Sequence, residues 1–310
     1  MTGALRLGTR GSQLALWQAE WVKAALARNG ITAVLEVIKT QGDTDVDRPL
    51  HLLEGKGFFT KEIEQALVDA RIDVAVHSLK DLPTRLPEGL ALGAVPARAD
   101  PAEVLVTRGP GGGVASLAGL ASGVRIGTSS LRRTAQIRYL RADLDIVPLR
   151  GNVPTRLRKV REGQDGLDAA LLTRAELERL GLAAGAGARL DPLEVMPAPG
   201  QGALGLEVRA DDGKARAALA PLEDAMSARA VMAERALLAA LEGGCQAPVA
   251  AYCGIREHGA GSRVFGRVTA QDGSVQITAS ADMDERDPAA AGAHVAALLR
   301  AHGASRLLGP

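Results

Sequence analysis

The segment VRIGTSSLRRTAQIRYLRADLDIVPLRGNVPTR, residues 124–156, predicts two consecutive strand–turn–helix units. An apolar strand at 124–127 leads into a Thr-Ser-Ser turn whose hydroxyls can cap a helix, and apolar residues at helical spacing follow. Arg132 and Arg133 fall in the first turn of that helix. Because a helix N-terminus already carries a partial positive charge, two cations there are unfavourable unless an anion lies close by.

The second unit repeats this arrangement. Arg150 stands at the end of the strand 145–149, Pro154 suits the first helical position, and Arg156 lies in the first turn that follows. Because ligands in open α/β sheets bind at the carboxyl ends of the strands, we expect both turns to face one place. Hydroxyls, unpaired backbone N–H groups and four guanidiniums predict a site for a ligand with several carboxylates or phosphates. The alternative for any single arginine is a solvated basic surface.

Length and composition narrow the class of protein. The chain has 310 residues, enough for two or three domains, and a net charge of +1, which argues against nucleic-acid binding by overall charge. The first ten residues contain no apolar signal region, and no apolar run reaches the length of a membrane span, so we expect a cytoplasmic protein with no membrane partner. The only cysteines are Cys245 and Cys253, without histidine at zinc spacing, so we expect neither a metal site nor a disulfide.

The N-terminal part contains another strand-to-helix turn. Arg10 and Ser12 follow a strand at 4–8, and the next helix is expected to place Leu14, Trp17 and Trp21 in the core. Residues 39–58 form a long polar loop, and loops of this length in a compact domain are usually functional. The sequence GKGFF at 55–59 fits a lid over a site. Simple packing of its two phenylalanines is an equal alternative.

A strand at 72–76 leads directly into His77, Ser78, Lys80 and Asp81. In isolation, Asp81 is best interpreted as a turn residue and His77 as a core histidine. Beside a site for polyanions, however, a carboxylate is discouraged by like-charge repulsion unless the ligand carries or develops positive charge. Asp81 is therefore a candidate catalytic acid.

Two linkers, at 96–103 and 197–200, indicate that the chain crosses twice between two α/β lobes. The predicted fold is α/β, with two flytrap-like (type II periplasmic-binding-protein-like) lobes that have mixed sheets, plus a small α+β third domain. The expected boundaries are 1–98 with 201–220 for lobe 1, 102–197 for lobe 2, and 222–310 for the third domain. A helix at 224–241 is expected to bury Met226 and to lead into the Gly-Gly-Cys245 loop. Cys245 is either a reactive thiol or a small buried hydrophobe.

Taken together, several segments resemble the porphobilinogen deaminase (hydroxymethylbilane synthase) family, nearly from end to end. They are GTRGSQLALWQ (8–18), GKGFFTKEIE (55–64), DVAVHSLKDLP (73–83), GTSSLRR (127–133), LRGNVPTRL (149–157), PGQGALGLE (199–207) and AERALLAALEGGCQAPVAAY (233–252). The sequence departs from the family at Glu176, where Ala-Gly-Leu is usual. The resemblance implies a transferase that condenses four porphobilinogen molecules head to tail, with release of ammonia, to form hydroxymethylbilane in tetrapyrrole (haem) biosynthesis.

The resemblance also implies a dipyrromethane cofactor, made from substrate and held on Cys245 by a thioether. The implied cofactor-binding residues are Cys245, Lys80, Asp81, Thr128, Ser129, Ser130, Arg132, Arg133, Arg150 and Arg156. The implied substrate-binding residues are Arg10, Ser12, Gln18, Arg150 and Arg156, with Lys56 and Phe59 on the lid and Asp81 as the catalytic acid. Each pyrrole ring bears an acetate and a propionate, which suits the arginines. Asp81 would protonate the leaving amine and then stabilise the ring cation.

Two alternatives remain at this point. A bilobal binding protein for an anionic small molecule would explain the lobes and the arginines, but it leaves Asp81 and Cys245 without a role. A cysteine hydrolase needs a histidine partner, for which His77 is the candidate. We expect porphobilinogen as the small-molecule partner and a monomeric enzyme.

Overall fold

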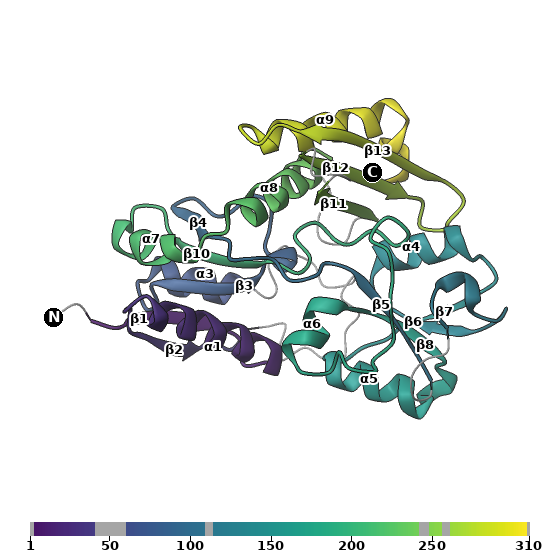
Figure 1. Cartoon of the computed structure of the whole chain (residues 1–310), viewed down its shortest axis with the longest axis horizontal. Coiled ribbons are helices and arrows are strands. Elements are labelled where there is room, and N and C mark those ends of the chain that lie inside the picture. The colour runs from purple at the N-terminus through teal and green to yellow at the C-terminus, as the bar shows by residue number, and fades with distance from the viewer. Residues whose placement is uncertain (1–2, 41–59, 109–113, 242–247, 256–260, 309–310) are drawn as a thin grey trace. The chain divides into compact units, whose positions relative to one another are not determined.

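A computed structural model of the chain describes residues 3–40, 60–108, 114–241, 248–255 and 261–308 (Figure 1). The chain divides into two compact units. The first unit comprises 1–99 and 202–228, and the second comprises 100–201 and 229–310.

The first unit is built on a mixed five-stranded sheet. Its strand order is β2 (Ala33–Val37), β1 (Leu5–Thr9), β3 (Val74–Ser78), β10 (Leu204–Arg209) and β4 (Leu90–Ala94). Strands β1, β2 and β3 are parallel, whereas β10 is antiparallel to both β3 and β4. Helices α1 (Gln13–Arg28) and α7 (Gly213–Leu219) contribute to the core on one face, and α3 (Lys61–Val68) contributes to a separate core cluster.

The buried face of α1 differs from the predicted one. Trp17 is 38% exposed and Trp21 is only partly buried, whereas Gln18, Ala19 and Val22 are buried. Small side chains let the helix approach the sheet closely, so the bulky tryptophans lie at the border of the contact. The prediction of the two tryptophans as core residues was therefore wrong for Trp17.

The second unit contains a sheet with the same pattern of pairing. Its strand order is β7 (Asp145–Val147), β6 (Arg125–Gly127), β8 (Ala169–Thr173), β5 (Glu103–Thr107) and β9 (Ala188–Arg189). Strands β6, β7 and β8 are parallel, and β5 is antiparallel to β8 and β9. Helices α5 (Val153–Glu162) and α6 (Arg174–Arg179) share one core cluster, and α4 (Leu131–Leu140) lies in another.

The third sheet, also in the second unit, is antiparallel. It consists of β11 (Val249–Ile255), β12 (Ser262–Thr269) and β13 (Gln276–Met283), and it packs with α8 (Ala225–Ala240) and α9 (Pro288–Ala301). The core residues of α8 begin near Ala230, so Met226, in the first turn, is 56% exposed. The expectation that Met226 is buried was wrong, because the helix starts before it reaches this core.

The predicted fold class is confirmed. The two mixed sheets share one strand pattern, in which the strand that enters from the other lobe (β10 or β5) runs antiparallel, and the third sheet with its helices forms a small α+β domain. Among the described residues, every helix is too short or too polar to span a bilayer.

Candidate functional site: a buried arginine pair at a sheet edge

Three helices of the second unit begin at one edge of its sheet. The parallel strands β6, β7 and β8 direct their carboxyl ends to this edge, and α4, α5 and α6 follow them. The Ser129 hydroxyl joins two of the turns, because Oγ donates to the Leu149 carbonyl at 3.0 Å and accepts from the Leu149 N–H at 3.2 Å. Ser130 caps α4 by accepting from Arg133 N at 3.4 Å, and Asn152 caps α5.

The sheet edge therefore collects most of the predicted anion-binding residues. They are Thr128, Ser129, Ser130, Arg132 and Arg133 from the β6–α4 turn, and Arg150 and Arg156 from the β7–α5 turn. Thr128 Oγ1 accepts from Ser130 N at 3.2 Å, and Arg156 Nε donates to the Gly151 carbonyl at 2.6 Å. Arg150 and Arg156 are half-buried. The turn at Gly151 requires a left-handed φ of 115°, which favours glycine.

Arg132 and Arg133 share one buried carboxylate. Glu103 opens β5 at this edge and is 0% exposed, and the two arginines are each 6% exposed. Arg132 Nη2 donates to Glu103 Oε1 at 2.6 Å. Arg133 binds through two nitrogens, with Nη2 at 2.7 Å from Oε2 and Nε at 3.1 Å from Oε1. Arg133 Nη2 also donates to Thr173 Oγ1 at 3.1 Å, next to the start of α6.

Burial and the neighbouring charges shift the pKa values of this cluster in opposite directions. Burial alone would raise the pKa of Glu103, but the adjacent Arg133 and Arg132 guanidiniums lower it from 4.5 to about 2. Burial lowers the pKa of Arg132, whereas for Arg133 the contact with Glu103 outweighs burial and raises the pKa. Glu176, in the first turn of α6, adds to the raised pKa of Arg133. The cluster is thus ionised, with two guanidiniums and one carboxylate.

Glu103 was missed from the sequence. Two cations at a helix start need an anion nearby, and the chain itself supplies one in Glu103, 29 residues before Arg132. The available signal was a single acid at the start of the apolar strand EVLV. Arg179 was also missed. It ends α6 and is 9% exposed, and burial lowers its pKa to about 10.

Cys245 lies within 242–247, outside the described residues, between helix α8 and strand β11 of the chain. Glu234 of α8 is 0% exposed and binds two backbone N–H groups, Gly200 N at 2.7 Å and Cys253 N at 2.8 Å. This carboxylate joins α8, β11 and the linker at 197–200. Cys253 is buried in the third-sheet core, with Sγ at 3.8 Å from Met283 Sδ.

The first unit has a second polar edge, at the carboxyl ends of β1 and β3. Ser12 caps α1 by accepting from Ala15 N at 3.3 Å, and the half-buried Arg10 precedes it. Gln18 is buried and its Nε2 donates to Ser78 Oγ at 2.8 Å, which joins α1 to the end of β3. After Ser78 the chain forms a 3₁₀ turn, in which Lys80 is half-buried and Asp81 is exposed.

The structure leaves the predicted lid undescribed, because Lys56 and Phe59 lie within the undescribed residues 41–59. It does place His77. The His77 Nε2 atom lies 3.0 Å from Glu207 Oε2, with both side chains buried, as expected for a core histidine. Burial, followed by the charge of Glu207, raises the pKa of the neighbouring Glu64. Within the described ranges, no cluster of three or more His, Cys, Asp or Glu residues is arranged to hold a metal ion.

Comparison with known proteins covers the chain almost completely. Residues 5–217 match the family model "Porphobilinogen deaminase, dipyromethane cofactor binding domain", and residues 228–301 match "Porphobilinogen deaminase, C-terminal domain". The porphobilinogen deaminase of Syntrophotalea carbinolica is 48% identical over 99% of this chain and 96% of its own length. That of Syntrophobacter fumaroxidans is 52% identical over 80% of this chain and 79% of its own length. That of Moorella thermoacetica is 46% identical over 98% of this chain and 95% of its own length.

Proposed function

Because the chain belongs to the porphobilinogen deaminase family, we propose that it condenses four porphobilinogen molecules head to tail, releases ammonia and forms hydroxymethylbilane. The enzyme is a transferase of tetrapyrrole biosynthesis, as predicted from the sequence. The observation that carries this conclusion is similarity along almost the whole of both chains, at 48% identity over 309 residues.

The residues at the sheet edge of the second unit fit a dipyrromethane cofactor. In the buried cluster, the guanidiniums of Arg132 and Arg133 share the single carboxylate of Glu103. Arg150 and Arg156 add two cations in the adjoining turn. A group with an acetate and a propionate on each ring would be matched by this excess of guanidiniums, since arginine binds carboxylates in a bidentate manner. Cys245 would hold the cofactor through a thioether, and Thr128, Ser129, Ser130 and Lys80 would add polar contacts. When bound, the group supplies the pyrrole end to which substrate is added.

Asp81 is proposed as the catalytic acid. A protonated Asp81 carboxyl can transfer its proton to the aminomethyl nitrogen of porphobilinogen as the C–N bond breaks and ammonia leaves. The resulting carboxylate then stabilises the positive charge that develops on the pyrrole ring of the substrate. Arg10, Ser12 and Gln18 bind substrate in this proposal. The hydrogen bond from Gln18 to Ser78 supports it, because this bond fixes the end of the strand that leads to Asp81.

The remaining assignments follow the same proposal. Lys56 and Phe59 form a lid, and the functional domains are 1–98 with 201–220, 102–197 and 222–310. The enzyme acts as a cytoplasmic monomer. Sedimentation at the mass of one chain and recovery in the cytosolic fraction would support this last point, and a dimer mass would contradict it.

The proposed function is tested by turnover. Purified protein incubated with porphobilinogen should release four ammonia molecules for each hydroxymethylbilane formed, when both products are quantified. A bilobal binding protein would bind porphobilinogen without releasing ammonia, and that result would replace the enzyme with the alternative.

A further inference from the structure

Arg267 is a buried cation on the strand β12 of the third sheet, and it is 8% exposed. Side chains alternate along a strand. A Cβ added at Gly266 would meet side chains of Leu237 and Val295, so that face of β12 packs against α8 and α9. Arg267 therefore extends from the opposite face of the sheet.

The guanidinium of Arg267 reaches helix α4 and the segment at 193–194, which belong to the same unit as the five-stranded sheet with β5 to β9. Nη2 donates to the Leu193 carbonyl at 2.8 Å, and Nη1 donates to the Glu194 carbonyl at 3.0 Å and to Gln136 Oε1 at 2.9 Å. Burial lowers the pKa of Arg267. A buried cation is costly unless it is hydrogen-bonded, so these neutral oxygens form a built site for this side chain.

Gln136 extends this contact toward the arginine cluster. It lies on α4, one turn after Arg132, and is 1% exposed. Its Oε1 accepts from Met196 N at 2.8 Å as well as from Arg267, and its Nε2 donates to the Met196 carbonyl at 2.9 Å. Because two N–H donors meet Oε1, they determine which way the amide is turned.

The Met196 carbonyl also accepts from Arg132. Arg132 Nη1 lies 2.5 Å from this oxygen, while Nη2 binds Glu103. A continuous buried path of hydrogen bonds thus runs from Arg267 through Gln136 and Met196 to Arg132. Hydrogen bonds in such a chain polarise one another, so removing one of them weakens its neighbours.

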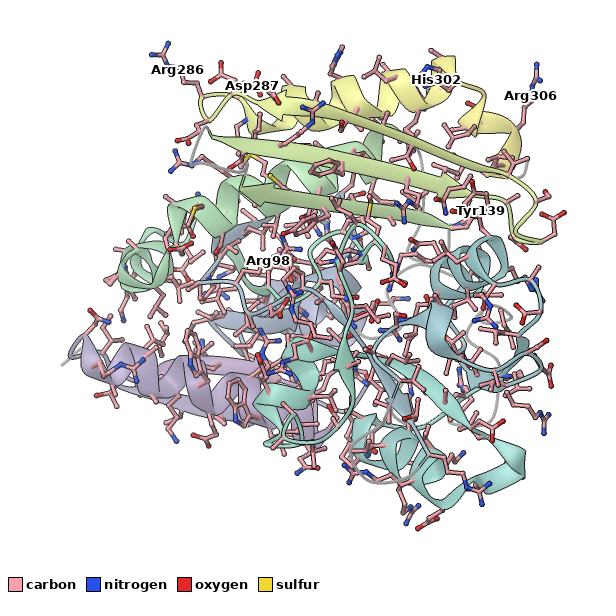
Figure 2. The ribbon with its side chains drawn as sticks, turned by 45° about the vertical axis from the view of Figure 1, so that its right-hand side comes forward. Arg98, Tyr139, Arg286, Asp287, His302 and Arg306 are labelled. Carbon is pink, nitrogen blue, oxygen red and sulfur yellow. The ribbon has the colours of Figure 1, made fainter. Side chains whose placement is uncertain are left out.

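A second contact holds the same two elements together. Arg138 Nη1 donates to the Gln271 carbonyl at 2.9 Å, at the turn between β12 and β13. A Cβ at Gly273 in this turn would lie 2.5 Å from Arg138 Cβ and 2.7 Å from Tyr139 N. Tyr139 lies at the end of α4 beside the strands of the third sheet (Figure 2). The C-terminal end of α4 is therefore fixed against the third sheet, and Arg267 fixes its middle.

We propose that Arg267 is a positioning residue, which orients the Arg132 guanidinium relative to the domain that carries Cys245. This inference rests on the proposed function. Arg267 would allow one anionic cofactor to be held by the Cys245 sulfur and the Arg132 guanidinium at the same time. Without Arg267, the 193–196 segment loses two carbonyl contacts and Gln136 loses one of the donors that orient its amide. Arg132 then presents its guanidinium in several orientations instead of one.

The test is the rate at which apo-protein acquires the cofactor. Full-length wild type and Arg267→Met, prepared without cofactor, are mixed with porphobilinogen, and the covalent adduct is followed by denaturing mass spectrometry. Arg263→Met is the matched control, because Arg263 lies on the same face of β12 and carries the same charge but has a 38% exposed side chain. We expect Arg267→Met to load about tenfold more slowly than wild type, and Arg263→Met to load at the wild-type rate.

A double-mutant cycle separates positioning from general loss of stability. If Arg267 acts through Arg132, then Arg132→Lys with Arg267→Met should load no more slowly than Arg132→Lys alone. With Arg150→Lys in place of Arg132→Lys, the two effects should multiply. Equal loading of Arg267→Met and wild type, or multiplied effects in both cycles, would overturn the inference.

If Arg267→Met does not fold, as judged by its thermal unfolding curve, the cycle is repeated with Arg267→Lys, which retains the charge but not the forked donors. The outcomes expected for Arg267→Met in the two cycles are also expected for Arg267→Lys. Should the wild type form no adduct, the proposed function fails together with the inference. A normal adduct in wild type and in Arg267→Met removes the inference alone.

Discussion

Replacing Glu103 with glutamine removes the counter-charge of the buried cluster and keeps the shape of the side chain. Glu103 is 0% exposed and binds Arg132 at 2.6 Å and Arg133 at 2.7 Å. In Glu103→Gln, two buried guanidiniums face each other without a carboxylate. Breaking a buried ion pair in this way is strongly destabilising, because the remaining charge is uncompensated.

The size of the effect follows from the pKa of Glu103. The ordinary value of 4.5 and the folded value of about 2 differ by about 2.5, which corresponds to about 3 kcal/mol of folding stability. Because the folded pKa lies below the ordinary one, this contribution is fully present above about pH 4.5. It is lost as the pH falls toward about 2. The stability gap between wild type and Glu103→Gln should therefore shrink from about 3 kcal/mol near pH 7 to about 1 kcal/mol near pH 3.

Urea unfolding followed by circular dichroism, at several pH values, measures this gap. Glu178→Gln is the control, because Glu178 pairs with Arg174 at 2.6 Å on an exposed part of α6. We expect this variant to lose less than about 1 kcal/mol. The reasoning is refuted if Glu103→Gln matches the control near pH 7, or if its gap to wild type stays constant as the pH falls.

Three further predictions concern single side chains. Asp81→Asn should lower kcat at least about a hundredfold, because the amide cannot transfer a proton, while the melting temperature stays within a few degrees; near-normal turnover would remove Asp81 from the mechanism. His77→Leu should cost about 3 kcal/mol in urea unfolding, because it leaves the buried Glu207 carboxylate without its partner, and an unchanged transition midpoint would contradict this. Ser12→Ala removes the cap of α1 and should cost about 1 kcal/mol, whereas Ser12→Gly should cost only a few tenths in the same assay.

Local chemistry made the arginine turns predictable. Ser130 caps α4, as expected from its capping preference. Pro154 lies at the second position of α5, one residue later than predicted, because Asn152 caps the helix and Val153 begins it. The parallel strands β6 and β7 then place both turns at one edge of the sheet, where their carboxyl ends meet and where ligands of open α/β sheets bind. This part could be predicted because each step depends on neighbours in the sequence.

Long-range partners could not be predicted in the same way. Glu103 lies in a segment that was interpreted as a linker, and only the pairing of β5 with β8 brings it to Arg132 and Arg133. The buried face of α1 was predicted wrongly because the hydrophobic periodicity gave most weight to Trp17. Ala19 is buried instead, because its small side chain lets the helix lie close to the sheet. Burial of Gln18 depends on its bond to Ser78, 60 residues away, which periodicity does not encode.

The proposed activity requires an anionic cofactor that is anchored on Cys245 and held by guanidiniums. Denaturing mass spectrometry of the purified protein beside its Cys245→Ser variant tests this most directly. The wild-type chain should be heavier than its sequence by two linked pyrrole units, and the variant should have the mass of its sequence alone. A wild type without added mass, or a variant that still carries it, would contradict the account.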